Sequence, residues 1–367
     1  MPEHDFTRWL QETVRRNASD LYVKAFAPPH VRVDGAIAPL DGPPLTPEQT
    51  EATARSIMQD DEWQAFAEQS ELDLALHVEG LGRFRVNVYR QQGCVSLVLR
   101  SIKQQVPSFE ELNLPAGVLR RLCREERGLV LLTGIAGSGK STTIAAMIAE
   151  INRTQRKHIV TIEDPVEYVF PDGQSLISQR EIGLDTHSFH DALRHVIRQS
   201  PDVIFIGEMR DLETMESAIM AAETGHLVLS TLHTLDAMQT VERIINFFPP
   251  HQHPQVRMQI SLVLKGVIAQ RLLVRADGTG RIPACQVMLT TPLVRKILHE
   301  GRTPELFEAI RKGTADGMTT FNQALLALIQ SGAVSQDEAR KYADNVEELD
   351  LALRGIYSGA ETHTPRR

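Results

Sequence analysis

The stretch Gly134-Ile-Ala-Gly-Ser-Gly-Lys-Ser141 decides the fold class of this chain. It fits the pattern G-x-x-x-x-G-K-[ST], which is the P-loop or Walker A motif. An apolar run that ends at Thr133 precedes the stretch, and apolar residues at helical spacing from Ile144 to Ile151 follow it. A strand before the loop and a helix after it are the context that the motif requires. A Gly-rich turn that binds nothing is the alternative, and both flanks argue against it.

The same stretch predicts binding of a nucleoside triphosphate with Mg²⁺. Backbone N–H groups of a P-loop surround the phosphates, and the N-terminus of the next helix adds partial positive charge. Lys140 is expected to reach the β- and γ-phosphates, and the Ser141 hydroxyl is expected to bind the metal ion. The predicted nucleotide-binding residues are Gly134, Ile135, Ala136, Gly137, Ser138, Gly139, Lys140, Ser141 and Thr142.

Short apolar runs alternate with amphipathic helices from Gly128 onward, which indicates a parallel sheet covered by helices. After about Thr290 the pattern becomes mostly helical, and Ser335 and Glu338 have the spacing of a capping box. We therefore predict an α/β fold with a helical C-terminal extension. The expected strands are 129–133, 158–162, 203–206 and 227–231.

The first hundred residues differ from this pattern, because they mix helical and strand patterns as a small α+β domain does. The segment Gly82-Arg-Phe-Arg-Val-Asn-Val-Tyr89 alternates like a half-buried strand, with Arg83 and Arg85 on its polar face. A chain of 367 residues exceeds one usual hydrophobic core, so two domains are expected. The predicted boundaries are 1–102 for the N-terminal domain, 103–117 for a linker, 118–290 for the α/β core, 291–358 for the helical region and 359–367 for a disordered tail.

Three carboxylates are expected at the carboxyl edge of the predicted sheet, where open α/β sheets bind ligands. Glu208 follows the strand at 203–206 and is expected to hold the water shell of the metal, as a Walker B residue does. Glu163 and Asp164 follow the strand at 158–162, and one of them is expected to orient or deprotonate the attacking water. For Asp164, which precedes a proline, a turn-forming role is an equal alternative.

Two histidines, His226 and His233, bracket the strand at 227–231. Their position predicts phosphate sensing, and a purely structural role is an equal alternative. A zinc site that also uses His251 and His253 is a poorer interpretation, because the spacings match no ligand pattern.

Charge and cysteine content exclude several classes of protein. The formal net charge of −8 argues against nucleic-acid binding over the whole surface, so no direct nucleic-acid partner is expected. Cys94, Cys123 and Cys285 lie far apart, which favours a reducing compartment and excludes a cysteine-based zinc site within one chain.

Neither a secretory leader nor a membrane span is expected. The N-terminus lacks a basic start and an apolar region, and it is instead typical of the opening of a helix. No apolar run reaches ~18 uninterrupted residues, the usual minimum for a membrane span. The run at 260–274 is interrupted by Lys265, Gln270 and Arg271.

Four ordered motifs together resemble those of the secretion ATPases, and in particular of the type IV pilus retraction ATPases of the PilT and PilU type. They are the P-loop, Thr161-Ile-Glu-Asp-Pro-Val-Glu167, Pro201-Asp-Val-Ile-Phe-Ile-Gly-Glu-Met-Arg-Asp211, and Ala222-Glu-Thr-Gly-His-Leu227 with Thr231-Leu-His-Thr234. The match covers nearly the whole chain. The resemblance implies a cytoplasmic, homohexameric, ATP-driven motor with a PAS-like N-terminal domain and a RecA-like ATPase domain.

The resemblance also assigns roles to individual residues. It makes Glu163 the catalytic glutamate, Glu208 the Walker B and metal residue, and His226 and His233 the His-box pair.

In the N-terminal domain, Arg85 and Arg100 match arginines that complete the nucleotide site of a neighbouring subunit. Arg83 matches less closely. The plain alternative for Arg83 and Arg85 is a solvated strand face.

Two further comparisons of sequence refine the predicted function. Pilus-extension and type II secretion ATPases of this superfamily usually carry a four-cysteine zinc module, which three scattered cysteines cannot build. Retraction is therefore favoured over extension. The segments Ile197-Arg-Gln-Ser-Pro201 and Asn246-Phe-Phe-Pro-Pro-His251 are closer to the PilU type.

The predicted function is powering pilus retraction, and thus twitching motility, at the inner face of the inner membrane through a membrane platform protein. One alternative is a pilus-extension or type II secretion ATPase. Another is an accessory nucleotide-binding subunit that acts with a companion retraction ATPase. A DNA translocase is disfavoured by the acidic net charge.

Overall fold

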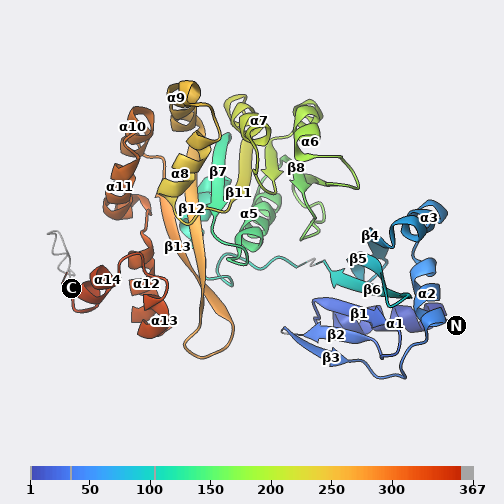
Figure 1. Ribbon diagram of the computed structural model, residues 1–367. Coiled ribbons are helices and arrows are strands. Elements are labelled where there is room, and N and C mark those ends of the chain that lie inside the picture. The colour runs from blue at the N-terminus through green and yellow to red at the C-terminus, as the bar shows by residue number, and fades with distance from the viewer. Residues whose placement is uncertain (1, 34, 103–104, 357–367) are drawn as a thin grey trace. The chain divides into compact units, whose positions relative to one another are not determined.

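The computed structural model describes residues 2–33, 35–102 and 105–356. The chain forms two compact units, residues 1–105 with 167–169 and residues 106–166 with 170–367 (Figure 1). Each unit has its own sheet and its own hydrophobic core. The predicted tail at 359–367 lies outside the described residues.

The first unit is a six-stranded antiparallel sheet with three helices, and its strand order is β3-β2-β1-β6-β5-β4. The strands are β1 (Asp20–Lys24), β2 (His30–Val33), β3 (Ala36–Pro39), β4 (Glu71–Val78), β5 (Gly82–Gln91) and β6 (Cys94–Ser101). The helices are α1 (Pro2–Arg15), α2 (Pro47–Ser56) and α3 (Asp60–Gln69).

The helices of this unit pack on one face of its sheet, because the strands alternate between apolar and polar residues. In β5, Phe84 and Val86 are fully buried, whereas Arg85 between them is only half-buried. The buried side chains form one core with Leu10 of α1 and Phe66 of α3. The arginines of β5 therefore lie on the opposite face of the sheet.

The second unit contains a seven-stranded sheet in the order β13-β12-β7-β11-β10-β8-β9. All neighbouring pairs are parallel except β12 and β13, which form an antiparallel hairpin. The strands are β7 (Gly128–Thr133), β8 (His158–Glu163), β9 (Leu176–Glu181), β10 (Val203–Ile206), β11 (Leu227–Leu232), β12 (Leu264–Val274) and β13 (Arg281–Leu289).

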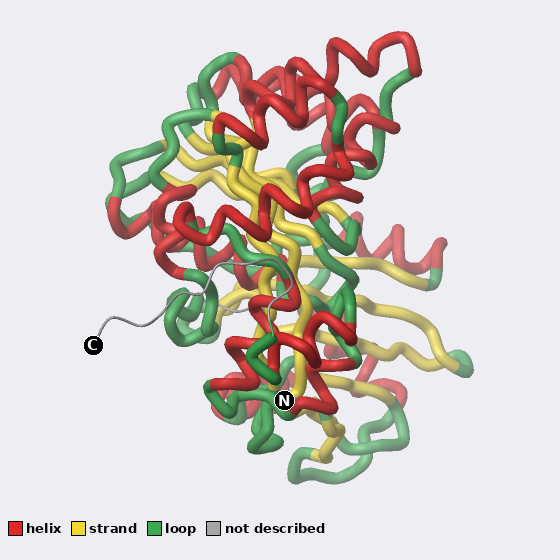
Figure 2. The backbone as a smooth tube through the Cα atoms, turned by 90° about the vertical axis from the view of Figure 1, so that its left-hand side faces the viewer, coloured by secondary structure: helices red, strands yellow, loops and turns green. Residues whose placement is uncertain are grey.

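The central strands of this sheet are covered on both faces. Every residue of β7, β10 and β11 is buried, which explains why these strands are short uninterrupted apolar runs. Figure 2 shows helices on both sides of these strands. The four strands expected from sequence are all present, and each lies within two residues of its predicted bounds.

The helices of the second unit are α4 (Ala116–Cys123), α5 (Lys140–Thr154), α6 (Phe189–Val196), α7 (Leu212–Glu223), α8 (Ala237–Asn246), α9 (His253–Val263), α10 (Pro292–Glu300), α11 (Leu306–Lys312), α12 (Phe321–Gln330), α13 (Gln336–Arg340) and α14 (Val346–Leu353). Short 3₁₀ helices lie at Ile197–Gln199, Pro250–Gln252, Thr303–Glu305 and Gly313–Asp316. The longest helix, α5, has 15 residues, and no helix among the described residues is long and apolar enough to cross a bilayer.

The C-terminal helices divide into two groups. Helices α10 and α11 extend the main core through side chains such as Ile297 and Ile310. Helices α12 to α14 form a separate small core with β12 and β13, centred on Phe321 and Leu325 (Figure 1). The expected capping box is half formed, because the Ser335 hydroxyl accepts from the Glu338 N–H while the Glu338 carboxylate binds Lys341 instead.

The segment 106–117, expected to belong to the linker, packs with the second unit. Phe109 is 2% exposed and Leu114 is 8% exposed, and both lie in the main core. The guanidinium of Arg120 binds the Glu110 carboxylate and stacks on Phe109. The Pro and polar residues of segment 106–117 are typical of a linker. Two buried side chains in a dozen residues give no periodic signal that would indicate packing.

Candidate functional site

The P-loop joins the end of β7 to the start of α5, and its glycines are needed for close packing. Gly134 and Gly139 have φ values of 141° and 91°, in the region that disfavours side chains. A Cβ at Gly134 would lie 2.5 Å from the carbonyl oxygen of Gln270, and a Cβ at Gly139 would lie 2.7 Å from the Gln270 amide nitrogen. The loop is thus seated on β12.

Gln270 holds the loop from a strand that sequence reasoning did not assign to the site. Its side chain is 3% exposed, and its Oε1 accepts from the Thr143 hydroxyl of α5 at 2.8 Å. The signal was present as a polar residue inside the apolar run at 260–274. Its partner could not be read from sequence, because Thr143 lies 127 positions away.

The interior of the loop offers polar groups to a ligand. Lys140 is 8% exposed, and its Nζ donates to the carbonyl oxygens of Gly134 at 2.7 Å and Ile135 at 3.0 Å. Ser138 and Thr133 each have a buried hydroxyl with no hydrogen-bond partner among the described residues. Buried donors left without partners are costly unless a ligand satisfies them, so the loop fits a phosphate.

Strand order brings three predicted side chains to the P-loop edge of the sheet. The carboxyl ends of β7, β11, β10 and β8 are consecutive there. His233 directly follows β11, Glu208 follows β10 after Gly207, and Glu163 ends β8. Backbone N–H groups of Gly207 and Met209 bond to the carbonyls of neighbouring strand ends, which fixes the segment that carries Glu208.

Glu163 is held by two neighbours. It is 6% exposed, and its Oε1 accepts from the Thr161 hydroxyl at 2.7 Å and from the Gln179 amide at 3.2 Å. Asp164, the next residue, is exposed. Two carboxylates that were equivalent in sequence are therefore different in structure, and only Glu163 has the fixed geometry expected of a base.

Glu208 binds two cationic or potentially cationic side chains. Its Oε2 lies 2.9 Å from Arg210, and its Oε1 lies 3.3 Å from Nε2 of His233. Partial burial by itself would raise the pKa of Glu208, but the hydrogen bond from Arg210 and the nearby His233 outweigh it and hold the pKa below its ordinary value. Glu208 is therefore a carboxylate at neutral pH, as a residue near Mg²⁺ must be.

Within one chain, His226 lies away from this group of residues, at the other end of β11. Leu232 pairs with Thr133 beside the P-loop, whereas Leu227 pairs with Gly128 at the opposite edge. Because β11 rises ~3.3 Å per residue, His226 and His233 are about 20 Å apart. The His226 ring instead contacts the carbonyl oxygen of Ala221 at 2.9 Å.

A cavity of about 650 Å³ adjoins the P-loop. Besides the loop residues 134–138, it is lined by the start of α8, by β12 and β13, and by residues 341–344. Arg271 connects these walls, since it lies 3.6 Å over the Phe321 ring and pairs with Asp344 at 2.7 Å. Sequence reasoning did not find this wall, because its parts are distant along the chain.

The protein oxygen atoms at the P-loop edge of the sheet are of the kind that Mg²⁺ binds. Mg²⁺ prefers oxygen ligands and usually takes one or two from the protein and the rest from water and phosphates. The half-buried Ser141 hydroxyl at the start of α5 and the Glu208 carboxylate are oxygen donors on this edge. No cluster of three or more His, Cys, Asp or Glu suited to a metal occurs among the described residues.

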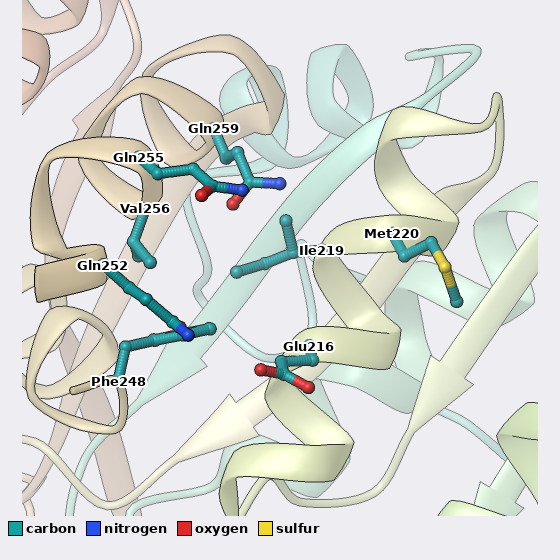
Figure 3. Close-up of a pocket in the computed structure, with 8 residues that line it drawn as sticks. All are labelled: Glu216, Ile219, Met220, Phe248, Gln252, Gln255, Val256 and Gln259. Carbon is teal, nitrogen blue, oxygen red and sulfur yellow. The ribbon is translucent and has the colours of Figure 1, made fainter.

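A second, smaller cavity of about 250 Å³ lies between α7 and α9 (Figure 3). Ile219 and Val256 point toward one another across it, and Met220 points away. Its remaining lining is mostly glutamine side chains with one carboxylate, Glu216. It contains none of the predicted site residues.

The two predicted arginines lie in the first unit. Arg85 of β5 is directly opposite Arg100 of β6 in the antiparallel register. Arg100 pairs with Asp20 at 2.9 Å, and Arg85 has no hydrogen bond or ion pair to any residue that the structure describes.

Comparison with known proteins places this geometry among secretion and pilus proteins. Residues 3–350 match the family described as Type II/IV secretion system protein. The chain is 43% identical over 350 residues to the type IV pilus ATPase PilU of Pseudomonas aeruginosa, covering 95% of this chain and 91% of that protein. It is 42% identical over 339 residues to PilT of the same organism, named a type IV pilus retractation ATPase, covering 92% and 98%.

The similarity extends to solved structures that cover nearly the whole chain. The crystal structure of the pilus retraction motor PilT with bound ADP has a TM-score of 0.86 and 45% sequence identity, and covers 93% of this chain and 97% of that chain. The predicted fold class is confirmed, and so is the resemblance to PilT and PilU. Of the two Pseudomonas aeruginosa relatives, PilU has the slightly higher identity.

Proposed function

The chain belongs to the Type II/IV secretion system protein family, and we propose that it is a hexameric, Mg²⁺-dependent ATPase that powers retraction of a type IV pilus. The observation that carries the proposal is the meeting of Glu163, Glu208 and His233 at the same sheet edge as the P-loop. The similarity to PilT and PilU relatives supports the pilus as the object of the work.

In this proposal the P-loop binds the phosphates and the two glutamates divide the chemistry. Lys140 and the loop N–H groups hold the β- and γ-phosphates, and Ser141 and Glu208 hold Mg²⁺ directly or through water. Bound Mg²⁺ would neutralise phosphate charge. Glu163 takes the proton of the attacking water, since its carboxylate is fixed by the Thr161 hydroxyl. His233, bonded to Glu208, reports on the state of the γ-phosphate.

Arg85 and Arg100 act in the nucleotide site of a neighbouring subunit, where guanidinium groups stabilise charge that develops on the phosphates. A site completed across an interface makes hydrolysis depend on assembly. This dependence is why we propose a homohexamer and not an independent monomeric enzyme.

Retraction is favoured over extension by the cysteines. Cys123 and Cys285 are buried in the second unit, and burial raises the pKa of both thiols, that of Cys285 to about 12. Three cysteines are one too few for a four-cysteine zinc module, and Cys94 belongs to the first unit. The motor works at the inner face of the inner membrane through a pilus platform protein.

The second candidate is an accessory subunit that works with a companion retraction ATPase, and the identity to PilU favours it. A phosphate-release assay separates the two functions. The purified chain is assayed with and without Mg²⁺, alone and mixed with a companion ATPase from the same bacterium. A motor hydrolyses ATP alone, whereas an accessory subunit shows turnover above the companion's own rate only in the mixture. If neither condition gives Mg²⁺-dependent turnover, the ATPase function is wrong.

A further inference from the structure

One row of residues crosses four strands of the N-terminal sheet on the face opposite its helices. The register pairs Arg85 with Arg100, Arg100 with Asp20, and Asp20 with Arg32. Because side chains directly opposite one another in a sheet share a face, these four residues form one charged row. The row holds three cations and one carboxylate.

Asp20 is the centre of the row and is unusually buried for a carboxylate, with 3% of its surface exposed. Its Oδ1 accepts from Nε of Arg100 at 2.9 Å, and its Oδ2 accepts from the Ser19 hydroxyl at 2.7 Å. Nε of Arg32 lies 3.3 Å from the same Oδ2. One carboxylate therefore fixes two guanidinium groups.

The two arginines bound to Asp20 differ in how many of their N–H donors stay available for a ligand. Arg32 also donates to the Tyr22 hydroxyl and to the Gly35 carbonyl oxygen, so it is bound within the unit. Arg100 contacts Asp20 only through Nε, its side chain is 70% exposed, and its Nη groups make no hydrogen bond to described residues. A guanidinium held at Nε presents its two Nη groups in a fixed direction.

The position of Arg85 completes the argument. Like charges directly opposite one another in a sheet are destabilising, and Asp20 offsets the charge of Arg100 but has no contact with Arg85. An oxyanion bound by both arginines would remove this repulsion. A phosphate suits the pair, because guanidinium groups match its geometry bidentately.

We propose that Asp20 is a positioning residue that presents Arg100, beside Arg85, to the phosphates of the nucleotide bound by a neighbouring copy of this chain. This inference rests on the proposed function, since it needs Arg100 to act at that nucleotide. Asp20 does not touch the nucleotide. It acts by fixing the direction of the Arg100 donors.

A double-mutant cycle in the full-length protein tests the assignment, with kcat of ATP hydrolysis as the readout. Arg100→Ala is expected to lower kcat by about 100-fold or more, as loss of a phosphate-binding arginine does. Asp20→Asn, which keeps the shape of the side chain, is expected to lower kcat about 10-fold with KM changed less, because Arg100 is then misdirected. The double variant is expected to match Arg100→Ala within about 2-fold.

The matched control is Asp73→Asn. Asp73 lies on the same face in β4, is exposed, and contacts Asn87 and not Arg100. It is expected to keep the parental kcat, which shows that loss of a negative charge on this face is not enough.

Three results overturn the inference. If the Asp20→Asn variant hydrolyses ATP at the parental rate while Arg100→Ala is impaired, Asp20 has no part in the mechanism. The proposed function is then unaffected. If the fold-losses in kcat of the two single variants multiply in the double variant, Asp20 and Arg100 act independently, and Asp20 has a purely structural role. If Arg100→Ala keeps the parental activity, the proposed action of Arg100 is wrong. The positioning role of Asp20 is then wrong as well.

A second variant keeps the proposal testable if Asp20→Asn does not fold. Arg100→Lys changes a mostly exposed side chain, keeps the charge, and loses the Nε and Nη geometry that Asp20 fixes. It is expected to lose at least about 10-fold in kcat. Parental turnover in Arg100→Lys would contradict the positioning role.

Discussion

Lys140 has its ammonium group inside the P-loop, where it binds two loop carbonyl oxygens. We expect Lys140→Ala to lower ATP turnover by at least ~100-fold, because charge stabilisation of this kind is worth several kcal/mol. Phosphate release by the purified variant measures the loss. The control is Lys296→Ala, which removes an exposed lysine of α10 and leaves the rate unchanged.

Glu163 and Asp164 are adjacent, and their roles can be separated. We expect Glu163→Gln to lower turnover by ~10²- to 10⁴-fold, because proton transfer to a positioned base contributes about that factor. Binding of a fluorescent ATP analogue should stay within about 2-fold of the parent. Asp164→Asn is the matched control and keeps turnover. If Asp164→Asn loses turnover and Glu163→Gln does not, the base has been assigned to the wrong carboxylate.

The low pKa of Glu208 predicts a pH dependence of stability. A carboxyl group whose pKa is lower in the folded than in the unfolded chain stabilises the fold above its ordinary pKa of 4.5, and this contribution is lost as the pH falls through the folded value. The free energy of unfolding of the parent relative to Glu208→Gln is therefore expected to shrink on acidification. Urea unfolding at about pH 5.5 and about pH 3.5 measures it. An advantage of the parent that grows on acidification would mean that Arg210 and His233 do not stabilise the carboxylate.

At the scale of residues, spacing alone predicted the P-loop and the carboxylates, because both follow apolar strands in a local pattern. Sequence could not assign Gln270 or Arg271, whose partners are distant in the chain. Because His226 and His233 bracket β11, they lie at opposite ends of that strand, as their spacing predicts.

At the scale of elements, β12 connects the P-loop to the C-terminal helices. Arg271 stacks on Phe321 of α12 and pairs with Asp344, and both residues belong to the helical end of the chain. Next to it in the strand, Gln270 seats the P-loop. Consecutive residues of β12 therefore make two different contacts: Gln270 contacts the P-loop, and Arg271 contacts α12.

We expect Arg271→Ala to loosen this connection and to weaken nucleotide binding. The free energy of unfolding should fall by about 1–3 kcal/mol, since a half-buried ion pair and a stacking contact with Phe321 are both lost. The KM for ATP should rise more than kcat falls, because the variant changes the wall of the cavity and not the catalytic groups. Hydrogen exchange of residues 321–353 measures the loosening of the C-terminal helices. Steady-state kinetics of ATP hydrolysis measures the change in KM.

The control for this variant is Arg275→Ala, in the same hairpin, whose one ion pair among the described residues is with Asp277 at the tip. It should leave both KM and exchange unchanged. Equal effects of the two substitutions would show that the contact with Phe321 has no special role.

The elements themselves followed from sequence where burial is complete. Strands β7, β10 and β11 were predictable because every residue is buried and apolar. The sequence favours a linker around Phe109, because irregular backbone with a few buried side chains has no periodic pattern. The helical region at 291–358 was expected as one part, and its division between two cores depends on contacts that no local pattern encodes.

At the scale of the whole molecule, the account requires neighbouring subunits to share nucleotide sites. We expect hexamers that contain both Arg100→Ala and Glu163→Gln subunits to hydrolyse ATP faster than hexamers of either variant alone. Some sites then combine an intact Glu163 with the intact Arg100 of a neighbour. Co-expression with two affinity tags isolates the mixed assemblies. Mixed assemblies no faster than the average of the two pure ones would show that Arg100 acts within its own chain.

The sequence pattern of one chain did not specify this assembly on its own. The alternation in β5 predicts only that Arg85 is on the polar face, which a solvated surface would explain equally well. The cross-strand pairing of Arg85 with Arg100 and the buried Asp20 behind it supplied the physical reason to prefer a bound anion.

The proposed role in pilus retraction is tested in the pilus-bearing bacterium that encodes this chain. The gene is deleted and then restored as the parent or as Lys140→Ala, and surface pili and retraction events are counted in each strain. The account predicts excess pili that do not retract in the deletion strain and with Lys140→Ala, and normal retraction with the parent. Cells without pili after deletion would contradict it, because the chain would then drive extension.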